Sequence, residues 1–339
     1  MSDLLLSVKN LRVELTTHRE IVHAVENVSF DLRQGETLGI VGESGCGKSM
    51  MLRTILGLLP RGGRVTGGEI VFQGTDLLSL NHQQLRDVRG RSIGMIFQEP
   101  MTALNPVMHV GLQIAEGPIA HLGFTKKAGK KRAVELMQQV GIPDAARRFG
   151  AYPSELSGGM RQRVMIAIAL ACEPKLLLCD EPTTALDVTI QDQILKLLLH
   201  LQESTGISMI FVTHDLAVVS QICQNVAVMY AAELVEVGPV AQVLPDPTHP
   251  YTLGLLRAVP DFDKVKEMLD PIPGIPPSLV EPPEGCRFRP RCNFAQDDCA
   301  TGDFPLLFVE GGRASACIHS DSCRDAALAD PVIGSRVAH

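Results

Sequence analysis

The sequence lacks the features that mark nucleic-acid binders, membrane-spanning proteins and secreted proteins. Its 31 Lys and Arg against 38 Asp and Glu give a net charge of −7, whereas a phosphate-backbone binder needs a basic excess. The longest strongly apolar stretch, Val164 to Cys172, has about half the roughly 20 residues of a membrane helix. The first residues show neither the basic region nor the long apolar region of a signal peptide. We therefore expect no nucleic-acid partner, no bilayer-spanning segment and a cytoplasmic location.

Tryptophan is absent, aromatic residues make up only 4% of the chain, and the nine cysteines are an odd number. Apolar residues at 45% and charged residues at 20% still give the composition of an ordinary globular protein. At roughly 150 residues per domain, a length of 339 residues predicts about two domains. A secreted disulfide framework is not indicated, because five of the cysteines are scattered along the chain: Cys46, Cys172, Cys179, Cys223 and Cys323.

Apolar periodicity predicts an α/β fold. Short alternating runs over residues 5–41 indicate strands joined by turns. Two further strands, Leu176 to Cys179 and Met209 to Thr213, flank a helix at Val188 to Glu203, and such a βαβ unit implies a parallel sheet. Between about 100 and 160 the period becomes helical, which predicts a helical insert.

The composition changes after Leu244. Seven prolines between Pro271 and Pro290 are too many for a helix or a central strand, and a cluster of cysteines follows. We therefore predict a separate C-terminal module. Residues 324–339 have no packing pattern and are expected to form a mobile tail.

Residues Gly42 to Ser49 have the spacing of a phosphate-binding loop, Gly-x4-Gly-Lys-Ser. In such a loop, backbone N–H groups and a helix N-terminus surround the phosphates, the lysine reaches the β- and γ-oxygens, and the serine hydroxyl takes Mg²⁺. A chance match is the alternative, but the loop follows the apolar strand Leu38 to Val41 and precedes a helix-like run, as the mechanism requires. We expect nucleotide contacts from Gly42, Ser44, Gly45, Cys46, Gly47, Lys48 and Ser49.

Two adjacent carboxylates end the apolar strand Leu176 to Cys179. Asp180 is placed to hold the Mg²⁺ shell, and Glu181 to polarise an attacking water. A solvated strand end is the alternative interpretation of such a pair, and the presence of a phosphate-binding loop argues against it.

Ser157, Gly158 and Gly159 precede a helix-like run from Met160 to Ala171. Because glycines have no side chain, such a helix start leaves backbone N–H groups accessible to an anion. The helix dipole adds a positive charge at this end. A flexible linker is the alternative. One chain with two phosphate-seeking surfaces suggests head-to-tail pairing of two subunits.

These motifs together resemble an ATP-binding cassette (ABC) subunit over roughly residues 5–240. The resemblance also rests on Gln98, the signature Leu156 to Gln162, the segment Ala185 to Asp187, and His214, all in family order. It implies a RecA-like parallel sheet core with an antiparallel β subdomain and a helical insert. It also implies ATP and Mg²⁺ as cofactors, with each nucleotide between one subunit's phosphate-binding loop and its partner's signature.

The resemblance assigns roles to single residues. It implies that Gln98 senses the γ-phosphate and Mg²⁺ and links to the helical insert. His214 would hold the γ-phosphate and the water, so that Glu181, His214 and Gln98 form the catalytic set. Asp187 is counted among the nucleotide-binding residues.

Two positions are unusual for this family. Residues 11–25 contain no aromatic side chain to stack on adenine, so Leu15 or Val22 is expected to pack there. Cys46 stands where the family often has Ser or Ala. The loop N–H groups and Lys48 predict a lowered pKa and a reactive thiol at Cys46; a small residue that faces inward is the alternative.

Further segments resemble the dipeptide/oligopeptide-importer branch and extend the resemblance to about residue 320. They are Gln98 to Pro106, Asp180 to Ile190, His249 to Thr252, and the block from Gly285 to Cys292. The expected organisation is an ABC ATPase domain at 1–245 with its helical subdomain at about 99–160, a C-terminal module at 246–323, and the tail.

This branch implies an ATP-hydrolysing subunit that energises import of dipeptides or oligopeptides through a membrane transporter. The implied partners are a paralogous second ATPase in a heterodimer, two transmembrane permeases and, indirectly, an extracytoplasmic substrate-binding protein. The implied location is peripheral, on the cytoplasmic face of the inner membrane, with Met101 to Val110 against the permeases. Nickel and glutathione importers share these features, and a non-transport ABC ATPase is the competing class.

The C-terminal cysteines have spacings of x5, x6 and x17: Cys286, Cys292, Cys299 and Cys317. A reducing cytoplasm disfavours disulfides. Four thiolates suit tetrahedral Zn²⁺, although zinc sites typically use short C-x2-4-C pairs. An iron–sulfur cluster accepts wider spacings, and resemblance to peptide-importer ATPases with this tail favours a [4Fe–4S] cluster over Zn²⁺. Three basic residues are expected to offset its negative charge: Arg287, Arg289 and Arg291.

Overall fold

The computed structural model describes residues 4–17, 19–184, 186–258 and 271–330, which form two compact units. The first unit contains Leu32–Glu36 and Asp76–Phe211 together with the residues up to Leu5. The second unit contains Leu6–Asp31, Thr37–Thr75 and the residues from Val212 on. No helix in the described ranges combines the length and the apolar character that a membrane crossing requires.

The second unit contains five strands of the larger sheet: β3 (Thr37–Val41), β9 (Asn225–Tyr230), β10 (Glu233–Pro239), β11 (Leu307–Val309) and β12 (Arg313–Ser315). Their order is β11-β12-β10-β9-β3. β3 and β9 are parallel, with Leu38 opposite Asn225. Every residue of β3 is buried, which is why this strand is a continuous apolar run in the sequence.

A second sheet has four strands: β1 (Leu4–Thr16), β2 (Ile21–Arg33), β4 (Gly63–Phe72) and β5 (Thr75–Asp76). Their order is β2-β1-β4-β5. β1 and β4 run antiparallel, with Leu6 opposite Phe72. One face of β1 and β2 is buried, in agreement with the alternating pattern of the sequence. The predicted antiparallel sheet is therefore present.

Three further strands follow in the order β8-β7-β6: β6 (Ile93–Ile96), β7 (Leu176–Asp180) and β8 (Ser208–Thr213), of which β6, β7 and β8 up to Phe211 belong to the first unit. β6 and β7 are parallel, with Ile96 opposite Cys179. The helix between β7 and β8 is α8 (Val188–Thr205). This succession is the predicted βαβ unit, and every residue of β7 and β8 is buried.

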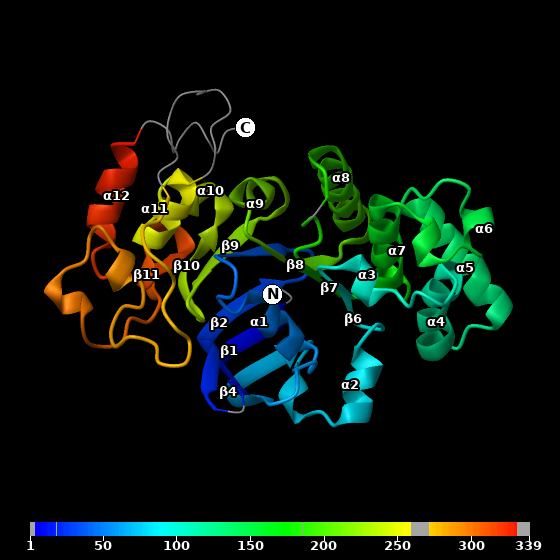
Figure 1. Cartoon of the computed structure of the whole chain (residues 1–339), viewed down its shortest axis with the longest axis horizontal. Helices are drawn as coiled ribbons and strands as arrows, with labels where there is room; N and C mark the ends of the chain where they lie inside the picture. Colours follow the sequence, from blue (N-terminus) through cyan, green and yellow to red (C-terminus); the bar gives the residue numbers. More distant parts are fainter. Residues whose placement is uncertain (1–3, 18, 185, 259–270, 331–339) are drawn as a thin grey trace. The chain divides into compact units, whose positions relative to one another are not determined.

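The predicted helical insert is also present in the first unit. It contains α3 (Pro100–Ala103), α4 (Val110–Leu122), α5 (Lys126–Gln139), α6 (Ala145–Arg148), η2 (Pro153–Glu155) and α7 (Gly158–Leu170). α4, α5 and α7 contact one another (Figure 1). The lysines at the start of α5 are exposed, as expected for the solvated side of a helix.

The described residues form further helices. They are α1 (Lys48–Ile55), η1 (Leu77–Ser79), α2 (His82–Val88), α9 (Leu216–Ile222), α10 (Val240–Val243), α11 (Pro250–Arg257), η3 (Arg289–Arg291), η4 (Asp297–Cys299), η5 (Glu310–Gly312) and α12 (Ser320–Leu328). α11 and α12 contact each other.

The prediction of a mobile tail from residue 324 was wrong for its first part. Residues 324–328 belong to α12, and Arg324 pairs with Asp246 at 3.0 Å. Only small apolar side chains on α12 are buried, Cys323 and Ala327, so the helix has little hydropathic signal in the sequence. Residues 331–339 of the predicted tail lie outside the described residues.

Two buried polar residues join β10 to α11. The carboxylate of Glu236 accepts hydrogen bonds from the backbone N–H and the hydroxyl of Thr248, both at 2.7 Å, and from the backbone N–H of His249 at 3.1 Å. The Nδ1 atom of His249 accepts the backbone N–H of Tyr251 at 3.0 Å and so caps α11. Burial lowers the pKa of His249 from 6.5 to about 3, so the imidazole is neutral and can act as the cap.

We expect His249 to make the chain less stable in acid. Below pH 6.5 the unfolded chain protonates this histidine while the folded chain does not, so the free energy of unfolding falls as the pH falls from 6.5 towards 3. The slope from this one residue is at most about 1.4 kcal/mol per pH unit. Urea unfolding between pH 4.5 and 7.5 measures it.

His249→Asn should reduce this slope, because an asparagine can cap α11 without taking up a proton. The same substitution at the exposed His200 controls for the loss of a histidine. Burial raises the pKa of the neighbouring Glu236. This shift opposes the effect of His249 on the free energy of unfolding, and it does so equally in the wild type and in His249→Asn. An unchanged slope in His249→Asn would contradict the assignment.

Candidate nucleotide site and cysteine cluster

The phosphate-binding loop of the second unit curls around the side chain of Lys48. It connects β3 to α1, and Lys48 is 4% exposed. The Nζ atom of Lys48 donates to the carbonyl oxygens of Gly42 at 2.7 Å and Glu43 at 2.9 Å. Gly47 has φ +110°, and a Cβ there would collide with the carbonyl oxygen of Ala24. The predicted strand, loop and helix are all present, with the ammonium group inside the loop.

Two neighbours of this loop hold its backbone. The backbone N–H of Glu43 donates to the hydroxyl oxygen of Tyr251 at 2.8 Å, and the backbone N–H of Ala232 donates to the carbonyl oxygen of Cys46 at 3.0 Å. Ser44 and Gly45 are exposed at the tip of the loop. Ser49 lies in the first turn of α1, which is the position that the motif requires of a Mg²⁺ ligand.

The prediction of a lowered pKa at Cys46 was wrong. Cys46 is 5% exposed, and burial raises the pKa of its thiol more than the nearby Lys48 lowers it. The Lys48 Nζ and Cys46 Sγ atoms lie 3.7 Å apart. Exclusion of water therefore outweighs the positive charge, and Cys46 is the small inward-facing residue of the alternative interpretation.

In the first unit, the end of β7 brings the two predicted carboxylates together with Gln98. Asp180 is buried at the last position of β7. The next residue, Glu181, has φ +44°, and its Oε2 atom accepts the amide N–H of Gln98 at 3.2 Å and the hydroxyl of Thr184 at 2.8 Å. The chain turns sharply at Glu181, and two donors orient its carboxylate.

Thr184 has no predicted role, although it lies in a segment that carries the family resemblance. Gln162 on α7 donates to the carbonyl oxygen of Pro182 at 2.6 Å, so the loop after β7 is also held by α7. Gln162 is 1% exposed. The signature helix and the loop that carries Glu181 are therefore connected by a buried hydrogen bond.

The signature residues form an exposed helix start. Ser157 is the N-cap of α7 and accepts the backbone N–H of Met160 at 3.3 Å. Ser157 and Gly158 are exposed and Gly159 is half-buried. Asp187 caps α8 in the same way, accepting the N–H of Ile190 at 2.9 Å. Anion binding at α7 stays a prediction, and so does the role of Asp187 toward a nucleotide.

The predicted nucleotide site is thus divided between the two units. The phosphate-binding loop belongs to the second unit, as does His214, which is exposed just after β8. Gln98, the carboxylates and the signature belong to the first unit. The structure places Gln98 against Glu181 in the first unit and Lys48 against the loop carbonyls in the second, and the roles of the site residues toward a nucleotide stay predictions.

The four cysteines of the C-terminal module line one small cavity together with Phe288, Phe294 and Phe304. Burial raises the pKa of Cys292 to about 11 and that of Cys317 to about 12, and the other thiols of the cluster add to both shifts. Thiols whose thiolate forms are disfavoured by burial and by one another favour a cation that would stabilise the thiolates. The donor set therefore fits a thiolate-bound metal group.

The spacing of these sulfurs is wide. Among the described residues, the group whose ligand atoms all lie within 4.8 Å of one another is Asp298, Cys299 and His319, not the cysteines. Tetrahedral zinc with Zn–S bonds of about 2.3 Å would require sulfurs about 3.8 Å apart. Within the described ranges, no three of the four cavity sulfurs therefore lie within 4.8 Å of one another, as the ligands of one zinc ion would.

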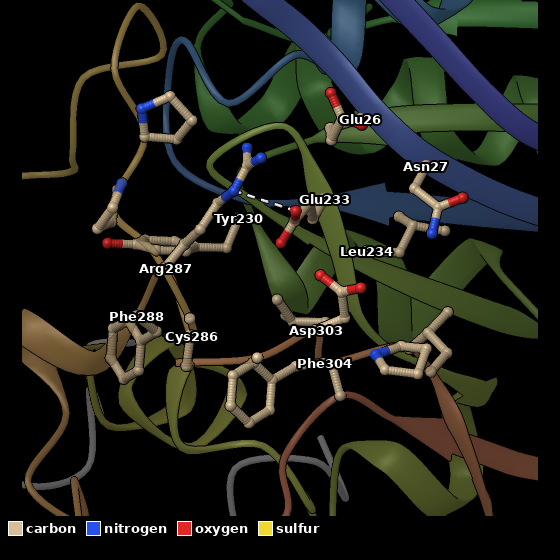
Figure 2. A pocket seen from close by; sticks show the side chains of 18 of the residues that line it. Glu26, Asn27, Tyr230, Glu233, Leu234, Cys286, Arg287, Phe288, Asp303 and Phe304 are labelled. Atoms are coloured by element: carbon tan, nitrogen blue, oxygen red, sulfur yellow. Dashed lines mark ion pairs between the residues drawn. The ribbon is translucent and has the colours of Figure 1, made fainter. Parts of the chain in front are cut away.

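A larger cavity of about 840 Å³ lies beside the cysteine cluster in the second unit. Figure 2 shows Cys286 and Arg287 at its wall, with Glu26, Glu233 and Asp303 from other segments. The Nε atom of Arg287 pairs with Glu233 at 3.0 Å. Burial raises the pKa of Glu233, and this ion pair opposes the shift.

Comparisons with known proteins agree with the motifs. Residues 25–184 match the family described as ABC transporter, and residues 235–299 match the one described as oligopeptide/dipeptide transporter, C-terminal region. The chain is 52% identical to the dipeptide transport ATP-binding protein DppD of Bacillus subtilis, over 85% of this chain and 86% of that protein. It is 46% identical to DppD of Escherichia coli, over 92% and 96%.

Among solved structures, the chain is similar to the ATP-binding cassette MJ0796 in a dimeric post-hydrolysis state bound to ADP and Pi. The TM-score is 0.63 and the identity 30%, covering 70% of this chain and 99% of that one. The predicted ABC cassette fold is therefore confirmed.

We expect Cys46 to react slowly with a maleimide in the folded chain. A buried thiol of raised pKa supplies little thiolate at neutral pH, so labelling should be at least about tenfold slower than in urea-unfolded protein. Mass spectrometry of the digested protein measures it. Cys223, which is 8% exposed and lies outside the loop, is the internal control, and clearly faster labelling of Cys46 than of Cys223 would contradict the prediction.

Proposed function

The chain belongs to the ABC transporter family, in its oligopeptide/dipeptide branch, and we propose that it is the ATP-hydrolysing subunit that energises import of dipeptides or oligopeptides through a membrane transporter. The observation that carries this function is the joint occurrence in one chain of an ABC cassette and the C-terminal region of this branch. Similarity to two DppD proteins extends over both parts. The chain is accordingly an ATPase that binds ATP and Mg²⁺.

Lys48 and the loop N–H groups bind the phosphates in this proposal. Bound Mg²⁺ supplies charge neutralisation at the β- and γ-oxygens, with Ser49, Asp180 and Gln98 as the residues that would hold it. The buried Lys48 ammonium already faces oxygen atoms, the carbonyls of the loop. Phosphate oxygens can replace those carbonyl oxygens as hydrogen-bond partners, so that the Lys48 ammonium stays surrounded by oxygen atoms when ATP binds.

Glu181 is the proposed general base. Its carboxylate is oriented by the amide of Gln98 and the hydroxyl of Thr184, which both donate to Oε2. His214 is proposed to hold the γ-phosphate and the attacking water. A γ-phosphate contact at Gln98 would alter its bond to Glu181, which supports a role for Gln98 in reporting the nucleotide state to the helices that follow it.

The exposed start of α7 supports pairing with a second subunit. Ser157 and Gly158 present N–H groups at the positive end of a 13-residue helix, where the γ-phosphate of a nucleotide bound by a partner can lie. A paralogous second ATPase is the proposed partner, which gives a heterodimer with composite sites.

The membrane partners are permeases, as membership of a dipeptide importer branch implies. Two permeases and an extracytoplasmic binding protein complete the proposed assembly, with this chain peripheral on the cytoplasmic face of the membrane. The segment after Gln98 is the proposed contact. Its apolar side chains Met101 and Val107 are 60% and 82% exposed, which is typical of an interaction surface.

The proposed resident of the cysteine cavity is a [4Fe–4S] cluster, with Zn²⁺ as the alternative. Four thiolates from one module are the ligands of such a cluster, and the wide spacing of the sulfurs favours a group larger than a single ion. Metal binding would stabilise this module, because ligation draws Cys286, Cys292, Cys299 and Cys317 together.

We expect Glu181→Gln to abolish peptide-stimulated ATP hydrolysis and leave ATP bound. The measurement uses the full-length chain assembled with its second ATPase and permeases, with and without peptide-loaded binding protein. Loss of the base should lower the rate on the order of 10² to 10⁴-fold with an unchanged dissociation constant for ATP.

Glu203→Gln, at an exposed position on α8, is the matched control and should retain wild-type turnover. Undiminished turnover in Glu181→Gln would exclude it as the base. A wild-type assembly whose ATPase ignores peptide-loaded binding protein would contradict peptide import.

Anaerobically purified protein should contain about four irons per chain, with a broad visible absorption that a reductant bleaches. Metal analysis and absorption spectroscopy measure this directly. Cys299→Ser should lower the iron content, while Cys172→Ser, outside the module, should not. Colourless protein with stoichiometric zinc would select the alternative.

A further inference from the structure

Glu43, inside the phosphate-binding loop, is held by an arginine of the C-terminal module. The guanidinium of Arg291 in η3 donates from Nη1 to Oε2 at 2.7 Å and from Nη2 to Oε1 at 2.9 Å. The two residues are 248 positions apart in the sequence. Parallel hydrogen bonds of this kind define both the position and the orientation of a carboxylate.

In this ion pair, the side chain of Arg291 is buried and held by further contacts. The side chain of Arg291 is 4% exposed and that of Glu43 is 28% exposed. Nε of Arg291 donates to the carbonyl oxygen of Pro273 at 2.7 Å, and its guanidinium lies 5.8 Å from the ring centroid of Tyr230. The hydrogen bonds to Glu43 raise the pKa of Arg291 above its usual value. This is not an exposed surface pair of little energetic consequence.

Glu43 is also one of the two loop residues whose carbonyl oxygens contact Lys48. Its carbonyl oxygen accepts the Nζ of Lys48 at 2.9 Å, and its backbone N–H donates to Tyr251 at 2.8 Å. Side chain, N–H and carbonyl of Glu43 are thus all engaged. A displacement of Glu43 would therefore move one of the oxygens that position the ammonium of Lys48.

A second arginine of the module holds the other side of the loop. Arg287 donates to the carbonyl oxygen of Ala231 at 2.5 Å and pairs with Glu233 (Figure 2). The next residue, Ala232, donates its N–H to the carbonyl oxygen of Cys46. The sequence led us to expect that Arg287 and Arg291 balance the charge of a metal cluster. In the structure, Arg291 contacts the phosphate-binding loop and Arg287 contacts the turn beside it.

We propose that Arg291 is a positioning residue of the nucleotide site: it holds Glu43, and through Glu43 it sets the phosphate-binding loop and Lys48 in the conformation that accepts ATP. The C-terminal module is then part of the nucleotide site as well as an appendage of the cassette. This inference rests on the proposed function, in which the loop binds ATP.

The test compares Arg291→Gln with Arg313→Gln in the full-length chain. Arg313 is a matched control, since it is 5% exposed and pairs with Asp246 at 3.0 Å in the same module, away from the loop. We expect Arg291→Gln to raise the dissociation constant and the KM for MgATP about tenfold, with a smaller change in kcat. Arg313→Gln should lower the melting temperature to a similar extent and leave the affinity for MgATP unchanged.

Glu43→Gln gives an independent measurement if Arg291→Gln folds poorly, because Glu43 lies at the surface of the loop. It should weaken MgATP binding to the same extent, and the double variant Glu43→Gln with Arg291→Gln should be no weaker than either single variant. Additive losses, or equal effects of Arg291→Gln and Arg313→Gln on affinity, would overturn the positioning role. Wild-type affinity in both Arg291→Gln and Glu43→Gln would do the same.

Failure of the wild-type chain to bind MgATP would instead refute the proposed function, and the positioning role with it. The melting temperature and the titration with MgATP together separate these results.

Discussion

The buried ammonium group of Lys48 is the constraint on which the candidate nucleotide site depends. A charge that is 4% exposed is costly unless oxygen atoms surround it, and the carbonyls of Gly42 and Glu43 provide them. The chain can bring both carbonyls to one point only by curling tightly between β3 and α1. Arg291 of the C-terminal module then stabilises this loop conformation through its hydrogen bonds to the side chain of Glu43.

Partnered charges of this kind recur around the start of the C-terminal module. Glu236 is fully buried among donors from residues 248 and 249, and the buried Arg313 pairs with Asp246. Removing one partner would leave a buried charge uncompensated, which is strongly destabilising. The proline-rich segment, which has few apolar residues, is held by another buried charge, because Nε of Arg291 donates to the carbonyl oxygen of Pro273. That attachment allows the module to act on the phosphate-binding loop.

Much of the candidate site could be predicted because its motifs are local. The phosphate-binding loop, the carboxylates after β7 and the helix start at Ser157 each depend on a few consecutive residues. Arg291 could be noticed in the sequence, but its partner could not, because Glu43 is 248 positions away. The pKa of Cys46 was misjudged for a related reason: the charge of Lys48 is visible in the sequence, while the exclusion of water is not.

The sequence by itself determined the chemistry of this protein and its order along the chain, since residue type and short spacing decide which groups can bind phosphate, polarise water or ligate a metal. Tertiary structure alone decided which arginine holds which carboxylate, which thiols lose contact with water, and that residues 324–328 form a packed helix. These outcomes depend on burial and on pairing between distant segments, and neither is encoded in any short stretch of residues.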